Sequence, residues 1–352
     1  MKNPRFFVPV GVLGSLLVTT FLIAAPALYA KTWYANVGAE THDQSVQADA
    51  FLPNEMWILA GDSIQWTFAP KNEIHTVTFL ASNQVRPLPP FPIGPPPPPI
   101  GPPVAFPANC GPFTTPQIYL GNCISSNPEN GGATFTVTFN NPGNYRLVCL
   151  IHTDMNGTVH VLTNNNQNAA LLHNQKFYDD EARDQANDLL SDRDDQREEV
   201  SDLPGNQVIA GIGEIAATGG GTQYRSVVRF LKSTITIHKG DSVTWTNLDP
   251  TEPHTVTFGP EGPQFNPTSQ ANLGTALEDG TLTGTISGPI TSPSDTVNSG
   301  FLQAQAPDRV GAPQLLPGKT RLTITFNKPG TYQYHCALHD VDGMLGTVVV
   351  LP

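Results

Sequence analysis

The fold of this chain is decided by residues 332–350, which read YQYHCALHDVDGMLGTVVV. Apolar residues alternate through the first part, a short loop follows, and a β-branched run completes the stretch, which predicts two strands joined by that loop. The loop carries a thiol, an imidazole and a thioether at Cys336, His339 and Met344. With one further imidazole, these groups make the trigonal His₂Cys set with a weak axial Met that suits copper.

The second imidazole is expected from a distant strand, and His254 in PHTVTF is the candidate. The same arrangement occurs earlier in the chain, where YRLVCLIHTDMNGTVHV contains Cys149, His152 and Met155. His75 in IHTVTF supplies the distant imidazole of that copy. Two copies of one four-residue set, in the same order and between the same strand patterns, predict two metal sites.

Both halves of the chain resemble cupredoxins, the small blue-copper β-sandwich proteins. The C-x₂-H-x₄-M spacing of the second loop is similar to that of plastocyanin and pseudoazurin, and the C-x₂-H-x₂-M spacing of the first is similar to that of amicyanin. The resemblance covers both ends of each half, but not the long insertions between the first histidine and the cysteine. It implies one type 1 copper in each half.

The resemblance also implies a role for each ligand. The cysteine thiolates are the strong ligands, the histidine on the upstream strand is buried, and the methionine is axial. The histidine of the loop lies nearest the surface, where electrons enter or leave in this family. In the order upstream His, Cys, loop His and Met, the implied ligands are His75, Cys149, His152 and Met155, then His254, Cys336, His339 and Met344.

The two halves align with each other by simple offsets. The turn GDS at 61–63 recurs at 240–242, and HTVTF at 75–79 recurs at 254–258, both displaced by 179 positions. Displacements that change only inside loops are expected of two copies of one domain. The predicted fold is therefore all-β, with two Greek-key cupredoxin sandwiches at residues 31–163 and 207–352.

Residues 164–206 differ from both halves in composition. Between residues 176 and 202 there are eleven acidic and four basic side chains. A thin apolar stripe at helical spacing runs through this segment, and Leu203-Pro204-Gly205 ends it. We expect an acidic helical linker between the domains, with its charges either simply solvated or used for docking; the stripe consists of Ala182, Ala186, Leu189 and Leu190.

The N-terminus predicts export. Residues 1–30 contain Lys2 and Arg5, then a long apolar run, then small residues, which is the layout of a secretory signal peptide cleaved after Ala27 or Ala30. The alternative is that the apolar run remains as a membrane anchor. Either reading places the chain in the periplasm, outside the cell or at its surface.

Two cysteines remain after the proposed ligands are set aside. Cys110 and Cys123 lie thirteen residues apart in a loop rich in Pro, Gly and Asn. In an oxidising compartment we expect a disulfide between them, and the alternative is two unpaired thiols.

Composition excludes several classes of partner. The net charge is −12 and no basic stripe is visible, which argues against nucleic acid and anionic lipid. Charged residues are 14% of the chain, with 34 Pro and 31 Gly, which favours short strands joined by turns over helical bundles. A proline-dominated segment at about 86–107 is expected to be a stiff surface loop, either a spacer or a docking segment for an aromatic groove.

The function expected from these features is one-electron transfer between redox partner proteins, without catalysis by the chain itself. One rival is a copper enzyme similar to nitrite reductases or multicopper oxidases, since His335 precedes Cys336 as in those families. No H-x-H pattern occurs in the chain, although such enzymes commonly need one for a further copper centre. The other rival is copper storage or delivery through the same ligands.

Overall fold

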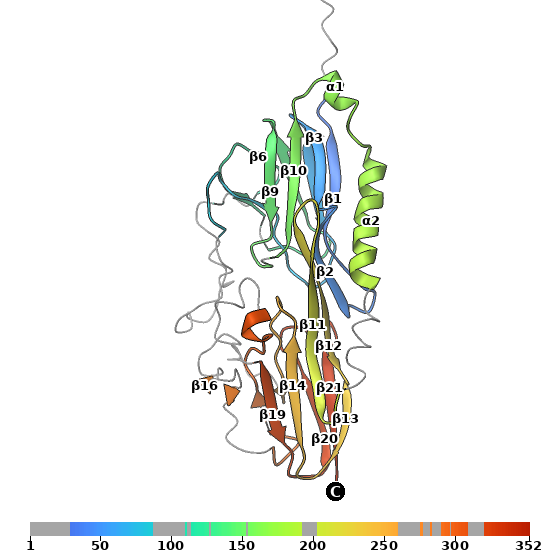
Figure 1. Cartoon of the computed structure of the whole chain (residues 1–352), viewed down its shortest axis with the longest axis vertical. Helices are drawn as coiled ribbons and strands as arrows, with labels where there is room; N and C mark the ends of the chain where they lie inside the picture. Colours follow the sequence, from blue (N-terminus) through green and yellow to red (C-terminus); the bar gives the residue numbers. More distant parts are fainter. Residues whose placement is uncertain are drawn as a thin grey trace, which may run out of the picture.

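The computed structural model describes residues 29–86, 110, 114–126, 128–152, 154–191, 203–259, 275–276, 282–283, 290–295, 297–308 and 320–352. The predicted signal peptide, nearly all of the proline-rich segment and residues 192–202 of the predicted linker lie outside the described residues. The described part is built mainly of strands, which confirms the predicted all-β class. Figure 1 shows two lobes arranged end to end along the long axis.

The N-terminal half contributes ten strands. They are β1 (Thr32–Glu40), β2 (Val46–Leu52), β3 (Glu55–Leu59), β4 (Ser63–Phe68), β5 (Thr78–Phe79), β6 (Gln117–Tyr119), β7 (Ile124–Ser125), β8 (Thr134–Phe139), β9 (Gly143–Val148) and β10 (Asn156–Leu162). In this half, β1, β2, β4, β6 and β8 form one layer, and a five-stranded sheet of order β3-β10-β9-β5-β7 forms the other.

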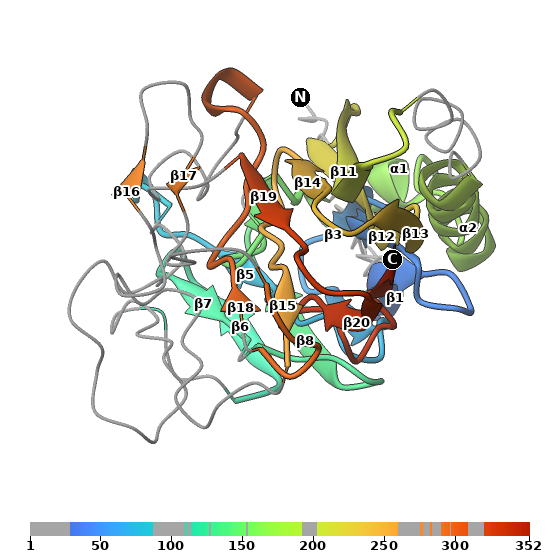
Figure 2. The ribbon, with the colours of Figure 1, turned by 90° about the horizontal axis from the view of Figure 1, so that it is seen from below.

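The C-terminal half repeats this plan. Its strands are β11 (Gln207–Ala217), β12 (Thr222–Leu231), β13 (Thr234–His238), β14 (Ser242–Leu248), β15 (Thr257–Phe258), β16 (Thr275–Ala276), β17 (Leu282–Thr283), β18 (Val297–Asn298), β19 (Arg321–Thr325), β20 (Gly330–His335) and β21 (Leu345–Leu351). The layer of β11, β12, β14 and β19 faces a sheet of order β13-β21-β20-β15-β18, as Figure 2 shows from below.

Alternation of apolar and polar residues explains why these segments form sandwich strands. In β4 every second residue is buried, and Trp66 lies in the core between the layers. Trp245 occupies the same place in β14, against Phe258 and Tyr334. Because side chains on a strand point alternately to its two faces, one buried face is enough to fix the register of each strand.

The two halves share one sheet. Strand β12 pairs antiparallel with β2, with Tyr224 opposite Asp49 and Val227 opposite Val46. This pairing joins the layer of β1, β2, β4, β6 and β8 to the layer of β11, β12, β14 and β19 in a single nine-stranded sheet. The resulting order is β19-β14-β11-β12-β2-β1-β4-β8-β6. The sequence patterns predict the two sandwiches but not this junction, because pairing between two strand edges leaves no local signal in either strand.

The acidic segment forms two helices, α1 (Asn166–Ala169) and α2 (Gln175–Ser191). Helix α2 lies along β1 and β2 and buries Tyr178, Ala182 and Leu189. Leu190 packs against the junction of the shared sheet, beside Val46 of the N-terminal half and other residues of the C-terminal half. The helix thus lies on one face of the shared sheet (Figure 1).

The loops of the two insertions contain a disulfide and a short hairpin. Cys110 and Cys123 are disulfide-bonded, which confirms the predicted pair. In the insertion at 260–316, β16 pairs with β17, and the 3₁₀ turn η1 (Ala306–Asp308) follows β18. No helix of the described residues is long and apolar enough to cross a membrane.

Candidate metal centres

The first candidate site lies at one end of the N-terminal sandwich. His75 is held just before β5 by a two-way backbone bridge to Glu129, with N–O distances of 3.0 and 2.9 Å. Cys149 follows β9 directly, and the loop from β9 to β10 carries His152 and Met155. That loop is closed by backbone hydrogen bonds from Cys149 N to Met155 O (3.1 Å) and from Met155 N to His152 O (3.2 Å).

The donor atoms of the first site face one another. Nδ1 of His75 lies 2.9 Å from Nδ1 of His152, and Sγ of Cys149 lies 3.7 Å from the latter. All three residues are buried, and their donor atoms lie within 4.8 Å of one another. The Cys149 sulfur also accepts hydrogen bonds from the backbone N–H groups of Thr76 and His152, both at 3.4 Å.

The second candidate site reproduces this geometry in the C-terminal sandwich. Nδ1 of His254 lies 3.2 Å from Nδ1 of His339, and Sγ of Cys336 lies 3.9 and 3.5 Å from these two nitrogens. Cys336 also accepts a hydrogen bond from Thr255 N at 3.3 Å. The loop is closed by Cys336 N bonding to Met344 O (3.1 Å) and Met344 N bonding to His339 O (3.0 Å).

Both methionines are fully buried beside these groups. Met155 belongs to the same core cluster as Cys149, and Met344 belongs to the cluster of Cys336. Two imidazoles and a thiol enclosed in an apolar core are the soft and borderline donors that suit copper. Among the described residues, these two His–Cys–His groups are the clusters of His, Cys, Asp and Glu with the spacing of metal ligands. His335 is not a member of either.

A glycine beside each upstream histidine was missed by the sequence analysis. A Cβ at Gly38 would lie 2.7 Å from Nε2 of His75, and a Cβ at Gly211 would lie 2.0 Å from Nε2 of His254. Both glycines have positive φ, +68° and +83°, and both lie at a bulge in the first strand of their half. Such a glycine within a strand pattern is a signal for a bulge or a close approach.

The loop histidines are the more exposed histidine of each pair, as expected, but only slightly, since His75 and His254 are 0% exposed. His152 is 5% exposed and His339 is 4% exposed. Glu252 of the C-terminal half places Oε1 3.4 Å from Nε2 of His152. Reciprocally, Asn72 of the N-terminal half donates a hydrogen bond to Asp342 of the second ligand loop (2.9 Å). Each half therefore covers the ligand loop of the other.

Carboxylates surround the first site. Oε1 of Glu73 lies 3.1 Å from Nε2 of His152, and Oδ1 of Asp49 lies 3.5 Å from Nε2 of His75. Burial raises the pKa of Asp49 to about 6, against the charges of the two histidines. Burial also opposes the charge on Glu73, but the hydrogen bond and charge of His152 lower the pKa of Glu73 to about 2.

The two cysteines differ in acidity in the metal-free chain. Burial disfavours the thiolate of Cys149, yet hydrogen bonds from His152 and His75 hold its pKa well below the usual range. Burial would lower the pKa of His152, but the charge of Asp49 helps to hold it well above its usual value. At the second site, burial raises the pKa of Cys336 and lowers that of His339.

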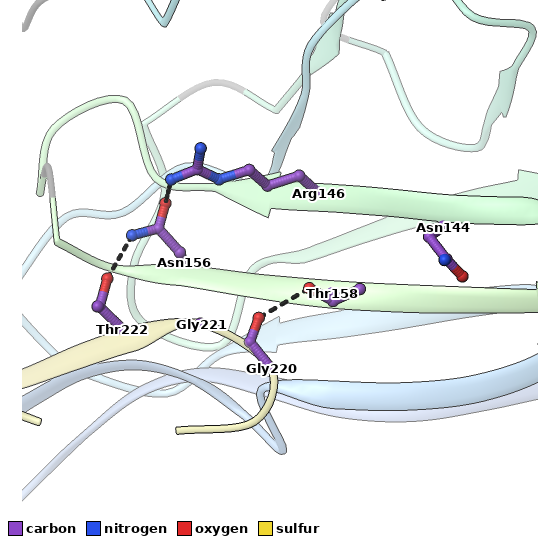
Figure 3. A pocket seen from close by; sticks show the side chains of 7 residues that line it. All are labelled: Asn144, Arg146, Asn156, Thr158, Gly220, Gly221 and Thr222. Carbon is purple, nitrogen blue, oxygen red and sulfur yellow. Dashed lines mark hydrogen bonds between the residues drawn. The ribbon is translucent and has the colours of Figure 1, made fainter. Parts of the chain in front are cut away.

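A pocket lies where the β11–β12 hairpin meets β9 and β10 (Figure 3). Arg146 donates to Asn156 Oδ1 (2.9 Å), and Asn156 in turn donates to the Thr222 hydroxyl (2.5 Å). The Thr158 hydroxyl donates to the carbonyl of Gly220 (2.8 Å). These hydrogen bonds fix the hairpin of the C-terminal half to the sheet of the N-terminal half.

Part of the chain matches a known protein family. The model of copper-binding proteins of the plastocyanin/azurin family matches residues 216–351, which include the whole second site. No curated protein sequence matches the chain.

Solved structures of plastocyanin and amicyanin are similar to parts of the chain. Oxidised plastocyanin of the fern Dryopteris crassirhizoma is 19% identical over 41% of this chain and 99% of that chain, with a TM-score of 0.20. A mutant amicyanin in its Cu(I) form is 18% identical over 43% of this chain and 88% of that chain, with a TM-score of 0.21. TM-scores this low carry no argument about the fold, which follows from the strand topology of the chain itself.

Proposed function

We propose that this chain is an exported electron-transfer protein with two type 1 copper sites, because its residues 216–351 match the copper-binding plastocyanin/azurin family. The observation that carries the proposal is the pair of buried His–Cys–His groups, each with a buried methionine in the same core cluster. The proposed ligands are those that the sequence indicates: His75, Cys149, His152 and Met155 at the first site, and His254, Cys336, His339 and Met344 at the second.

Bound copper would supply a one-electron couple, Cu(II)/Cu(I), at each site. The residues of the chain keep the surroundings of the metal nearly fixed. The strand ends, the bridge of His75 to Glu129 and the closed ligand loops hold the donor atoms in place. A rigid donor set lets the charge of the metal change with little movement of the protein, and this favours transfer of electrons over transformation of a substrate.

The remaining parts of the proposal rest on the sequence. Export is supported by the predicted signal peptide and by the disulfide of Cys110 and Cys123, which suits an oxidising compartment. The domain division at 31–163, 164–206 and 207–352 is supported by the repeated offsets. The proposed partners are redox proteins that donate or accept single electrons.

The first experiment is the copper content and visible spectrum of the oxidised full-length chain. We expect two coppers per chain and an intense thiolate-to-copper absorption band. Cys149→Ser and Cys336→Ser should each remove one copper and weaken the band. His42→Ala, at an exposed histidine outside both sites, is the matched control and should leave the copper content and the absorption band unchanged. A colourless copper-loaded chain would contradict the proposal.

The same measurement separates the rival functions. A further copper without strong colour, with its own paramagnetic signal, would favour a copper enzyme. Rapid loss of copper to a chelator would favour storage or delivery, because a buried and closed ligand loop should exchange its metal slowly.

A further inference from the structure

The two sites differ in one buried side chain. Phe51 pairs with the residue just before the Gly38 bulge, and Phe230 pairs with the residue just before the Gly211 bulge. Two residues before these phenylalanines stand Asp49 in the N-terminal half and Val228 in the C-terminal half. The displacement of 179 positions agrees with that from His75 to His254.

The charge of Asp49 is directed at the first site. Its side chain is 2% exposed, and its Oδ1 lies 3.5 Å from Nε2 of His75, the nitrogen that faces away from the other donors. A carboxylate there favours a proton on Nε2 and leaves the Nδ1 lone pair free for a metal. The equivalent Val228 is an alkyl group. Nε2 of His75 and Nε2 of His254 are both buried without a hydrogen-bond partner among the described residues, so the sites differ here in the charge of the neighbouring side chain.

The C-terminal half packs directly against this arrangement. Tyr224 lies opposite Asp49 in the β2–β12 pair and is fully buried. Its hydroxyl donates to Oε1 of Glu252 at 2.7 Å, and that oxygen lies 3.4 Å from Nε2 of His152. Each histidine of the first site therefore has a buried carboxyl group beside its Nε2, Asp49 from the N-terminal half and Glu252 from the C-terminal half.

Carboxyl groups collect at the first site. Asp49 lies beside His75, and Glu73 lies beside His152. Glu252 also lies beside His152, but burial raises its pKa well above the usual range, so the negative charge there comes from Asp49 and Glu73. Charges buried in a protein interact more strongly than charges in water, and outer groups of this kind tune the potential of a metal site. Anionic neighbours stabilise the higher charge of Cu(II) relative to Cu(I).

We propose that Asp49, which is replaced by Val228 in the other half, gives the first copper site a lower reduction potential than the second. This inference rests on the proposed function. In the chain reduced by one electron, the electron then resides at the second site. Bound copper would supply both half-reactions, since one electron lost at the first site would be gained at the second without a proton. Asp49 is thus a positioning residue that acts on the metal through His75.

The test measures the midpoint potential of each site separately in full-length protein. The Cys336→Ser chain retains the first site, and the Cys149→Ser chain retains the second. We expect the first site to have the lower potential by at least about 59 mV, a tenfold change in the ratio of Cu(II) to Cu(I). Equal potentials, or a lower potential at the second site, would overturn the inference.

A variant of Asp49 and a matched surface control make the test specific. In the Cys336→Ser chain, Asp49→Asn keeps an acceptor oxygen but removes the charge, and should raise the potential by about 59 mV or more while weakening Cu(II) binding roughly tenfold. Asp188→Asn makes the same chemical change on the exposed face of α2 and should leave both values unchanged. Equal shifts in these two variants would show that only net charge matters, and would refute the role of Asp49.

The two single-site chains keep the test decisive if Asp49→Asn fails to fold. Both chains retain Asp49, so equal potentials in them would count against the proposal whatever the variant does. Absence of the thiolate-to-copper band from both single-site chains would instead reject the proposed function itself.

Discussion

Oε1 of Glu252 lies 3.4 Å from Nε2 of His152, although the two residues belong to different halves of the chain. The contact closes over the nitrogen through which a loop histidine would otherwise meet solvent. Asn72 makes the reciprocal contact with Asp342 of the second ligand loop. Contacts between the halves therefore leave only a small exposed area of either loop histidine, 5% at His152 and 4% at His339.

This arrangement predicts protection of the loop histidines. We expect diethyl pyrocarbonate to modify His42, His173 and His238, which are exposed, much faster than His152 and His339, which are 5% and 4% exposed. Mass spectrometry of the native chain would measure the rates, with the urea-unfolded chain as control. Equal rates at His42 and His152 in the native chain would show that the halves separate readily.

The turn GDS, which occurs in both halves, gives a matched pair for a stability test. Asp62 is buried and accepts hydrogen bonds from Lys31 N, Leu59 N and Trp33 Nε1 at 2.8–3.1 Å. Asp62→Ala should lower the free energy of unfolding by about 3 kcal/mol, because it leaves buried donors without an acceptor.

The exposed equivalent of that aspartate should matter less. Asp241 accepts one backbone hydrogen bond, from His238 N at 2.9 Å. Asp241→Ala should therefore cost about 1 kcal/mol in denaturant unfolding. A cost equal to that of Asp62→Ala would contradict the difference in burial.

The packing of α2 on the N-terminal half can be tested at one hydroxyl. Tyr178 donates to the carbonyl of Trp57 (2.8 Å) and accepts from its N–H (3.0 Å). Tyr178→Phe removes both hydrogen bonds and should lower the free energy of unfolding by about 1–3 kcal/mol. Tyr34→Phe, at a side chain that is 53% exposed, is the control and should have no effect.

The disulfide should contribute to stability without contributing to the metal sites. Replacing both Cys110 and Cys123 by Ser opens a loop with a sequence separation of 13. We expect a loss of about 3 kcal/mol, the value for a loop of this length. Copper content and colour should stay unchanged, so loss of either would mean that the loop also orders the first site.

The sequence predicts the donor sets because their signals are local. Cys336, His339 and Met344 lie in one short loop, and the structure brings Cys336 and His339 into one group with His254, as the repeated strand patterns require. The all-β class follows from alternation in strands such as β4, where buried and partly exposed residues take turns.

The environment of the sites could not be predicted, because it depends on how the two halves meet. Nothing in the sequence around Val46 or Val227 indicates that β2 and β12 pair. Without that pairing there is no reason to place Tyr224 beside Asp49, or Glu252 beside His152. The burial of the loop histidines is likewise a property of the interface, whereas the family pattern describes a single domain.

The pairing of β2 with β12 has a consequence for attempts to produce the halves separately. Each of these strands would become an open edge in an isolated half, with a row of unpaired N–H and C=O groups. Such edges invite pairing between molecules, and β2 is buried along its whole length in the intact chain. Isolated halves should therefore associate through these strands, and the tandem arrangement protects each half from self-association.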